Sequence, residues 1–329
     1  MNAPTTAKAP VGRTATARRT LPRGLSGMSW VVWRNNRTAL LLLIGLTAVV
    51  SLYCLVQRVG LVEYMGSPEA ELGSLRDADE DVIDKLIPVL QFLPVALGVF
   101  LGAPLVASEY ENSTLRLTST QSVGRLRIVM TTLAVPLVVV ALCTTVLTLS
   151  FTWLWHPART IYNGGNWWDG GLFFATGPVP VAFSLFTVSA GVLAGAVLRR
   201  SVAAMAITLV GPALTGSVAL EYLRTWFVSP HRIFYPDGTE PPGLKPGDVS
   251  IDNWVATADG KVYGWGTCAR ATEKESAECD AKHGIVKDAI DYVTLDQMPG
   301  LQWMISGVLL ALAAVAIVGT AWWTHRRSL

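Results

Sequence analysis

The stretch TALLLLIGLTAVVSLYCLV, residues 38–56, decides the fold class because it has no charged side chain and is apolar on every face of a helix. A helix rises about 1.5 Å per residue, so about 20 such residues cross the hydrocarbon core of a bilayer. A buried helix of a soluble protein is usually shorter and carries charges on one face. This stretch therefore predicts a transmembrane helix.

Five further windows without Asp, Glu, Lys or Arg follow along the chain. Charged residues are only 15% of the 329 residues, well below the roughly 25% of ordinary soluble domains. All of them lie between or beyond the windows, which excludes a single soluble globular domain. We expect an all-α integral membrane protein with six transmembrane helices, in windows 38–57, 86–108, 128–158, 170–198, 201–220 and 297–324.

The distribution of basic residues predicts the orientation of these helices. Residues 1–37 contain seven Lys and Arg and no acid, and the connections 109–127 and 199–200 and the C-terminal tail are also rich in arginine. Basic connections stay in the cytoplasm. We therefore expect a multi-pass plasma-membrane protein with both termini cytoplasmic. The first window lacks a cleavage site and is expected to be an uncleaved anchor.

Composition divides the chain into four parts. Residues 26–37, SGMSWVVWRNNR, suit either a short interfacial helix or a plain aromatic anchor. The parts are a disordered basic tail at 1–25, the interfacial helix with transmembrane helices 1–5 at 26–220, an extracytoplasmic segment at 221–296, and transmembrane helix 6 with a basic tail at 297–329.

The segment 221–296 is expected to be a small stapled domain outside the membrane. Asp259-Gly260 lies between two β-favouring runs and predicts a hairpin. Residues 271–284 predict a helix that ends at Gly284. In an oxidising exterior we expect a Cys268–Cys279 disulfide. The alternative is a zinc site that includes His283 or His231, which lacks a second close Cys/His pair.

Several spans carry patterns of small or hydroxylated residues. The patterns Gly98-x-x-x-Gly102 and Gly191-x-x-x-Gly195 let helices approach closely, without saying which partner packs there. Thr144, Thr145 and Thr148 either line a polar groove or bond to their own helix backbone, and we favour the second reading. The windows contain no ionisable Asp, Glu, Lys or Arg, which counts against an ion-driven carrier.

No pattern in the chain indicates catalysis. The sequence lacks the phosphate-binding pattern GxxxxGK[ST], the zinc-protease pattern HExxH and the nucleophile pattern GxSxG. We therefore expect a chain that is not an enzyme and that has no catalytic or metal site and no cofactor of its own.

The most unusual region is the connection at 109–127, which reads, with its flanks, LGAPLVASEYENSTLRLTSTQSVGRLRIV over residues 101–129. Glu109 and Glu111 are the only acids on the side that is otherwise basic. Acids near a helix N-terminus are favourable for the helix dipole, so a capping role is one interpretation. The other is a short cytoplasmic helix that docks against a soluble partner.

This connection resembles that of the permease subunits of type-2 ABC exporters, specifically an actinobacterial-like branch. The family form begins E-x-E-x-G-T, which Glu109-Tyr-Glu111-Asn-Ser113-Thr114 matches except for serine in place of glycine. Thr120-Gln121-Ser122-Val123-Gly124-Arg125-Leu126-Arg127 is similar to the later T-Q-S-V-x-R-x-R element, with Gly124 where serine is common.

The resemblance implies a transport subunit powered by separate ATPases. The connection would be the coupling helix, formed by Glu109, Tyr110, Glu111, Thr114, Arg116, Gln121, Arg125 and Arg127. ATP and Mg would bind the partner ATPase. A second permease subunit would complete a homodimer or heterodimer in membrane lipid, with no role for nucleic acid. The implied substrate is a drug, antibiotic or lipid-like molecule moved outward. The alternative is a non-transporting scaffold or sensor whose outer domain binds an extracellular partner.

Overall fold

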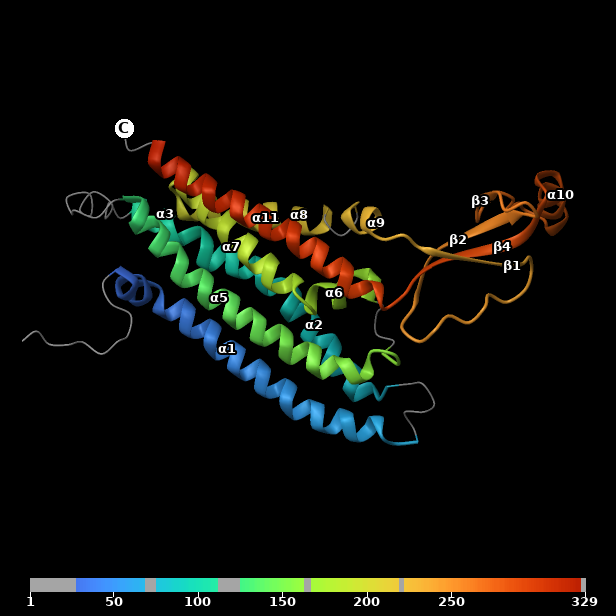
Figure 1. Ribbon diagram of the computed structural model, residues 1–329, viewed down its shortest axis with the longest axis horizontal. Helices are drawn as coiled ribbons and strands as arrows, with labels where there is room; N and C mark the ends of the chain where they lie inside the picture. Colours follow the sequence, from blue (N-terminus) through green and yellow to red (C-terminus); the bar gives the residue numbers. More distant parts are fainter. Residues whose placement is uncertain (1–27, 69–74, 112–124, 163–166, 219–221, 327–329) are drawn as a thin grey trace, which may run out of the picture.

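The structure, a computed structural model, describes residues 28–68, 75–111, 125–162, 167–218 and 222–326. Figure 1 shows a bundle of long helices with a small β-sheet domain projecting from one end. The described residues are thus mostly helical. The C-terminal end of α11 and the end of α3 lie together at the opposite end of the bundle.

Five helices are long and apolar enough to cross a membrane: Val32–Met65, Asp77–Ser108, Thr132–Ala158, Val179–Leu198 and Gln297–Arg326. The window at 201–220 forms a shorter apolar helix, so the expectation of six spans stays a prediction. The elements of the bundle are α1 (Met28–Met65), α2 (Asp77–Leu97), a π-helical segment η2 (Gly98–Gly102), α3 (Ala103–Glu111), α5 (Arg125–Trp155), α7 (Val179–Leu198), α8 (Ser201–Val218) and α11 (Gln297–Arg326).

Two boundaries differ in detail from the sequence windows. The sequence left open an interfacial helix or an aromatic anchor at residues 26–37, and from Met28 onward this stretch is continuous with the span in α1. The window 170–198 is divided into α6 (Gly171–Ala175) and α7, joined through Gly177 at φ +65°. Proline at the start of α7 favours a new helix there, because its φ is fixed near the helical value.

The break before α7 is held by a glutamine from the last helix. Gln302 of α11 is 4% exposed, and its Nε2 donates to the carbonyl oxygens of Phe173 and Thr176 and to the Thr176 hydroxyl. These acceptors lie at the end of α6, where carbonyl groups have no helical partner. A Cβ on Gly177 would lie 2.1 Å from the Gln302 Oε1 atom, so the glycine is required by its neighbour as well as by its φ.

Helix α7 is the centre of the bundle. It packs against α2, η2, α3, α5, α8 and α11. In its most apolar stretch 61% of the residues are buried, compared with 28% in α1. The sequence of α7 explains this position, because its Gly, Ala, Ser and Thr residues let other helices come close.

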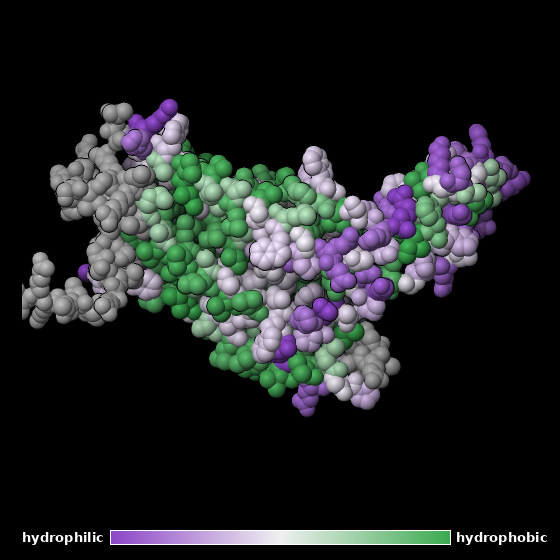
Figure 2. Space-filling view, in the orientation of Figure 1, coloured by the Kyte–Doolittle hydropathy of each residue, from purple (hydrophilic) through white to green (hydrophobic). Residues whose placement is uncertain are grey.

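The outward face of the bundle suits a lipid environment. Figure 2 shows a broad hydrophobic surface over the bundle and a largely hydrophilic surface over the sheet domain. The exposed Trp303 and Trp322 mark the two ends of α11. At 1.5 Å per residue they lie about 28 Å apart along the helix, close to the ~30 Å thickness of a hydrocarbon core. Tryptophan is enriched at both membrane interfaces.

The expectation of an all-α protein is wrong for the outer segment, which holds a four-stranded antiparallel sheet of order β1-β4-β2-β3. The predicted hairpin is confirmed as β2 and β3, and the predicted helix as α10, capped by the Thr272 hydroxyl and closed by Gly284 at φ +69°. The remaining pairing is between segments far apart in sequence, which the local patterns did not show. The elements are α9 (Arg224–Phe227), β1 (His231–Pro236), β2 (Val249–Thr257), β3 (Val262–Gly264), α10 (Glu273–His283) and β4 (Ile285–Val293).

Candidate functional site

The expected coupling residues that the structure describes lie at the end of the bundle opposite the sheet domain. Tyr110 and Glu111 are the last residues of α3, and Arg125 and Arg127 belong to the first turn of α5. Of these side chains the structure describes Tyr110 and Glu111. Thr114, Arg116 and Gln121 lie outside the described residues, as do the side chains of Glu109, Arg125 and Arg127.

Glu111 binds the first residue of another helix. One carboxylate oxygen accepts a hydrogen bond from the backbone N–H of Ser201 at 2.8 Å, and the other accepts from the Ser201 hydroxyl at 2.7 Å. Ser201 begins α8, where the first N–H groups have no partner within the helix. These two bonds hold the pKa of Glu111 below its usual range, with a smaller contribution from the Arg200 charge. The carboxylate thus caps a helix to which it does not belong.

A second contact joins the same two parts of the chain. The Arg199 guanidinium lies 5.0 Å from the centre of the Tyr110 ring, within the range of a cation–π interaction. Arg199 ends α7 in the left-handed conformation at φ +56°, and its N–H donates to the carbonyl of Gly195. Among the described residues it is the only non-glycine with a positive φ. The turn after α7 is therefore fixed in the position that brings Arg199 over Tyr110.

Just before this site the two small-residue patterns of the sequence pack against each other. A Cβ on Gly102 would lie 2.6 Å from the carbonyl oxygen of Val188, and one on Gly191 would lie 2.5 Å from that of Gly98. A Cβ on Gly195 would lie 2.5 Å from the Ala103 carbonyl oxygen. The glycines of α7 and of the η2 segment thus serve a contact within one chain.

The hydroxyl groups of α5 divide into two kinds. Thr144 and Thr145 donate to carbonyl groups one turn earlier in their own helix, as favoured from the sequence. Thr148 is buried and has no hydrogen-bond partner among the described residues. It lines a small apolar pocket with Leu90 and Ser184 that has no room for a water molecule. No substrate pathway is visible at this point of the described bundle.

The end of the bundle next to the sheet domain is held together by different side chains. The Tyr162 hydroxyl donates to the Asp84 carboxylate, and burial followed by that hydrogen bond raises the pKa of Tyr162. The Arg58 guanidinium lies 4.0 Å from the centre of the Trp153 ring and also donates to the Trp153 carbonyl. These contacts join α1 to α5 and α2 to the connection after α5.

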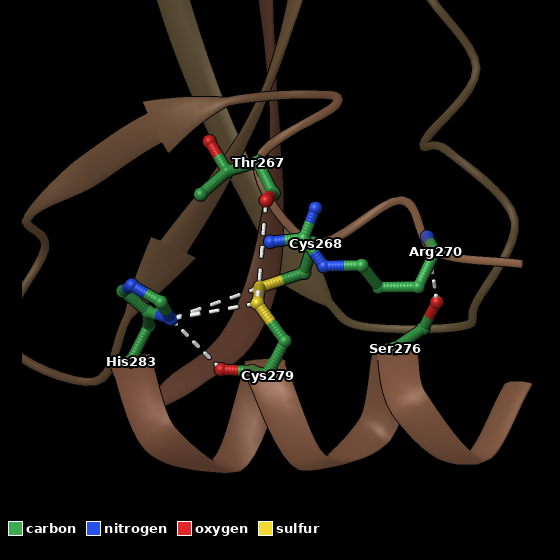
Figure 3. Close-up of a disulfide and its surroundings, with 6 residues drawn as sticks. All are labelled: Thr267, Cys268, Arg270, Ser276, Cys279 and His283. Carbon is green, nitrogen blue, oxygen red and sulfur yellow. Dashed lines mark hydrogen bonds between the residues drawn. A yellow bond between two sulfur atoms is a disulfide. The ribbon is translucent and has the colours of Figure 1, made fainter. Parts of the chain in front are cut away.

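The sheet domain contains the Cys268–Cys279 pair as a disulfide bond, with an S–S distance of 2.04 Å (Figure 3). His283 points towards it, with Nδ1 3.6 Å from the Cys279 sulfur and 3.8 Å from the Cys268 sulfur. The same nitrogen lies 2.9 Å from the Cys279 carbonyl oxygen. The three side chains form the one group of possible metal ligands found among the described residues. Metal-binding cysteines act as thiolates, which the two sulfurs are not while they are bonded to each other.

The sequence patterns did not reveal three polar residues that organise the bundle: Arg199, Ser201 and Gln302. Ser201 had a usable signal, because serine directly before an apolar run is typical of a helix start. Arg199 and Gln302 had none, since their partners are more than 80 positions away in the sequence. The expected site at Glu111 therefore extends to the turn between α7 and α8.

Comparison with known proteins gives one match. The family model described as "ABC-2 membrane transporter related" matches residues 37–224, more than half of the chain. No curated protein and no solved structure matches. The matched range contains the Glu111–Ser201 contact and ends before the outer sheet domain and α11.

Proposed function

The chain belongs to the ABC-2 membrane transporter related family, and from this premise we propose that it is the permease subunit of an ATP-driven exporter. Separate ATPase subunits bind ATP and Mg, and this chain carries no hydrolytic step. A second permease subunit, identical or homologous, completes the pathway. The substrate is a hydrophobic or amphipathic molecule, such as a drug, antibiotic or lipid-like compound, that moves outward by alternating access.

The observation that carries this proposal is the joined set of helix ends at one end of the bundle. The end of α3, the start of α5 and the turn between α7 and α8 lie at the ends of spans, and the last two carry arginines. Tyr110 and Glu111 bind the α7–α8 turn there. An ATPase that pushes on the 109–127 connection thus acts on several spans at once. The coupling role of Glu109, Thr114, Arg116, Gln121, Arg125 and Arg127 is part of the proposal.

We place this end in the cytoplasm and count α8 as span 5, which brings the number of spans to six. Its 18 residues extend about 27 Å at 1.5 Å per residue, nearly the thickness of a hydrocarbon core. Both termini are then cytoplasmic, because α1 begins and α11 ends at the same end of the bundle (Figure 1). The arginine-rich connections support this orientation under the positive-inside rule.

Co-purification from the native membrane tests the proposal. We expect the full chain to isolate with an ABC ATPase and to stimulate its ATP hydrolysis. The variant Arg125→Glu/Arg127→Glu should lose the ATPase but retain membrane insertion, since both residues lie outside the apolar windows. Gly211→Ala is a matched control in α8, because a Cβ at Gly211 would meet nothing within 4 Å. If no ATPase isolates with the wild-type chain, a scaffold or sensor function for the outer domain is favoured.

A further inference from the structure

Helix α8 depends on few neighbours. It packs against α7 and against the continuous helix formed by α2, η2 and α3. Much of its remaining surface is exposed apolar side chain, including Val202 at 80% exposure, and also Ile207, Leu209, Val210, Leu214 and Val218. The contacts through which the rest of the chain can move α8 are therefore mainly those with α3 and α7.

Among the described residues, α8 makes its side-chain hydrogen bonds to these neighbours at its first residue. Glu111 accepts both the N–H and the hydroxyl of Ser201, at 2.8 and 2.7 Å. Hydrogen bonds with an ionised acceptor are roughly twice as strong as neutral ones. The residue before Ser201 is Arg200, whose side chain has no acceptor and cannot cap the helix. The N-terminal cap of α8 is thus supplied by α3.

We propose that Glu111 is a positioning residue that makes α8 move together with α3, so that movement of the 109–127 connection reaches span 5 directly. This inference rests on the proposed function. It assigns to Glu111 a role in coupling that does not require contact with the ATPase. The Tyr110–Arg199 contact and the Gly195–Ala103 contact hold the intervening α7 in the same unit.

Glu111 has two effects: it stabilises the start of α8, and it joins that start to α3. Glu111→Ala removes both. Adding Arg200→Asp supplies an acceptor next to the α8 start, because aspartate is a preferred N-cap residue. Glu111→Ala/Arg200→Asp therefore restores the cap without restoring the link to α3. Glu111→Gln keeps an acceptor oxygen and serves as the conservative variant.

Spin-label distances in the permease–ATPase complex measure the link. One label pair joins Leu42 of α1 to Phe100 of η2, and the other joins Leu42 to Val202 of α8. All three side chains are at least 70% exposed, so the labels disturb little packing. The buried Cys54 and Cys143 are replaced by alanine in every sample. Each pair is measured without nucleotide and after trapping with ATP and orthovanadate.

In the wild-type complex and in Glu111→Gln, both distances are expected to change on trapping. In Glu111→Ala/Arg200→Asp the Phe100 pair should still change, while the change at the Val202 pair is lost. A Val202 change of wild-type size in that double variant would overturn the proposal. Absence of any change at either pair in the wild type would instead contradict the proposed transport function.

Discussion

At the scale of single residues, buried hydroxyl groups that look alike in sequence have different tasks. Thr187 of α7 donates its hydroxyl to the carbonyl of Pro94 in α2, across the helix interface. Thr148 of α5 is equally buried and has no partner among the described residues. The difference is one of position, because the Pro94 carbonyl of α2 lies within hydrogen-bonding reach of Thr187.

Replacement by the isosteric valine distinguishes these two threonines. We expect Thr187→Val to destabilise the protein by about 0.6 kcal/mol, the average measured for hydrogen bonds between membrane helices, and by at most about 1.7 kcal/mol. Thr148→Val should be neutral or stabilising, since it removes an unsatisfied buried hydroxyl. Thermal unfolding in detergent measures both. An equal loss of stability in the two variants would show that the inter-helix bond contributes nothing.

Asp291 of β4 binds side chains from both neighbouring strands of the sheet domain, β1 and β2. Its carboxylate accepts from Nε and Nη2 of Arg232, each at 2.6 Å, and from the Trp254 indole N–H at 2.9 Å. The hydrogen bond from Arg232, opposed by burial, holds the pKa of Asp291 below its usual range. Asp288 on the same strand is shifted the other way, because burial followed by the Asp237 charge raises its pKa.

The stability from Asp291 should therefore depend on pH. It is fully present above the ordinary aspartate pKa and is lost as pH falls through the lowered pKa of the folded state. We expect Asp291→Asn to reduce stability by about 1–3 kcal/mol at neutral pH, with a smaller difference from wild type in acid. Hydrogen-exchange protection of β1 and β4 reports it. Comparison with wild type at each pH removes the opposite contribution of Asp288.

At the scale of elements, the contact between α7 and the η2 segment has no space for side chains. A Cβ at Gly98, Gly102 or Gly191 would lie 2.5–2.8 Å from a carbonyl oxygen of the other segment, and one at Gly195 would lie 2.5 Å from that of Ala103 in α3. The π-helical turn spans Gly98–Gly102 within this contact. Such turns occur mostly as single insertions in α-helices and are frequent at functional sites.

Alanine at these glycines should therefore separate the two helices. Gly191→Ala is expected to cost about 1–3 kcal/mol, as overpacking of a filled interior does. Gly307→Ala in α11 is the matched control, because a Cβ there meets nothing within 4 Å. The control should be neutral or slightly stabilising, since alanine favours a helix over glycine. Melting temperatures of the two variants in the same detergent decide the matter, and similar values would contradict the close approach.

At the scale of the whole molecule, the hydrophobic band and the hydrophilic outer domain define how the chain sits in a bilayer (Figure 2). The exposed Trp303 and Trp322 place the two interfaces on α11. Val315 lies between them and is 68% exposed on the protein surface. A spin label at 315 should therefore collide readily with oxygen and poorly with a water-soluble nickel complex, and labels at 303 and 322 should show the reverse. Frequent collisions of a label at 315 with the nickel complex would mean that this face of α11 contacts water.

The division of the chain was determined by the sequence alone. Transfer of a charge into hydrocarbon is costly, so membrane spans lack charges, and long apolar windows without charge indicate where they lie. The hairpin at Asp259-Gly260 and helix α10 with its Gly284 end were also predicted, since turn and capping signals act over a few residues. The membership in the transporter family was indicated by Glu109–Arg127 and is supported by the match over 37–224.

Only the tertiary structure decided which of these residues meet. The strand order of the outer sheet joins β1 to β4, which local propensity does not specify. The glycine patterns of η2 and α7 are partners of each other, and Glu111 caps α8 while Gln302 closes α6. Local patterns describe the face of a helix or the end of a strand. The identity of the partner depends on contacts between distant parts of the chain, which form only when the bundle packs.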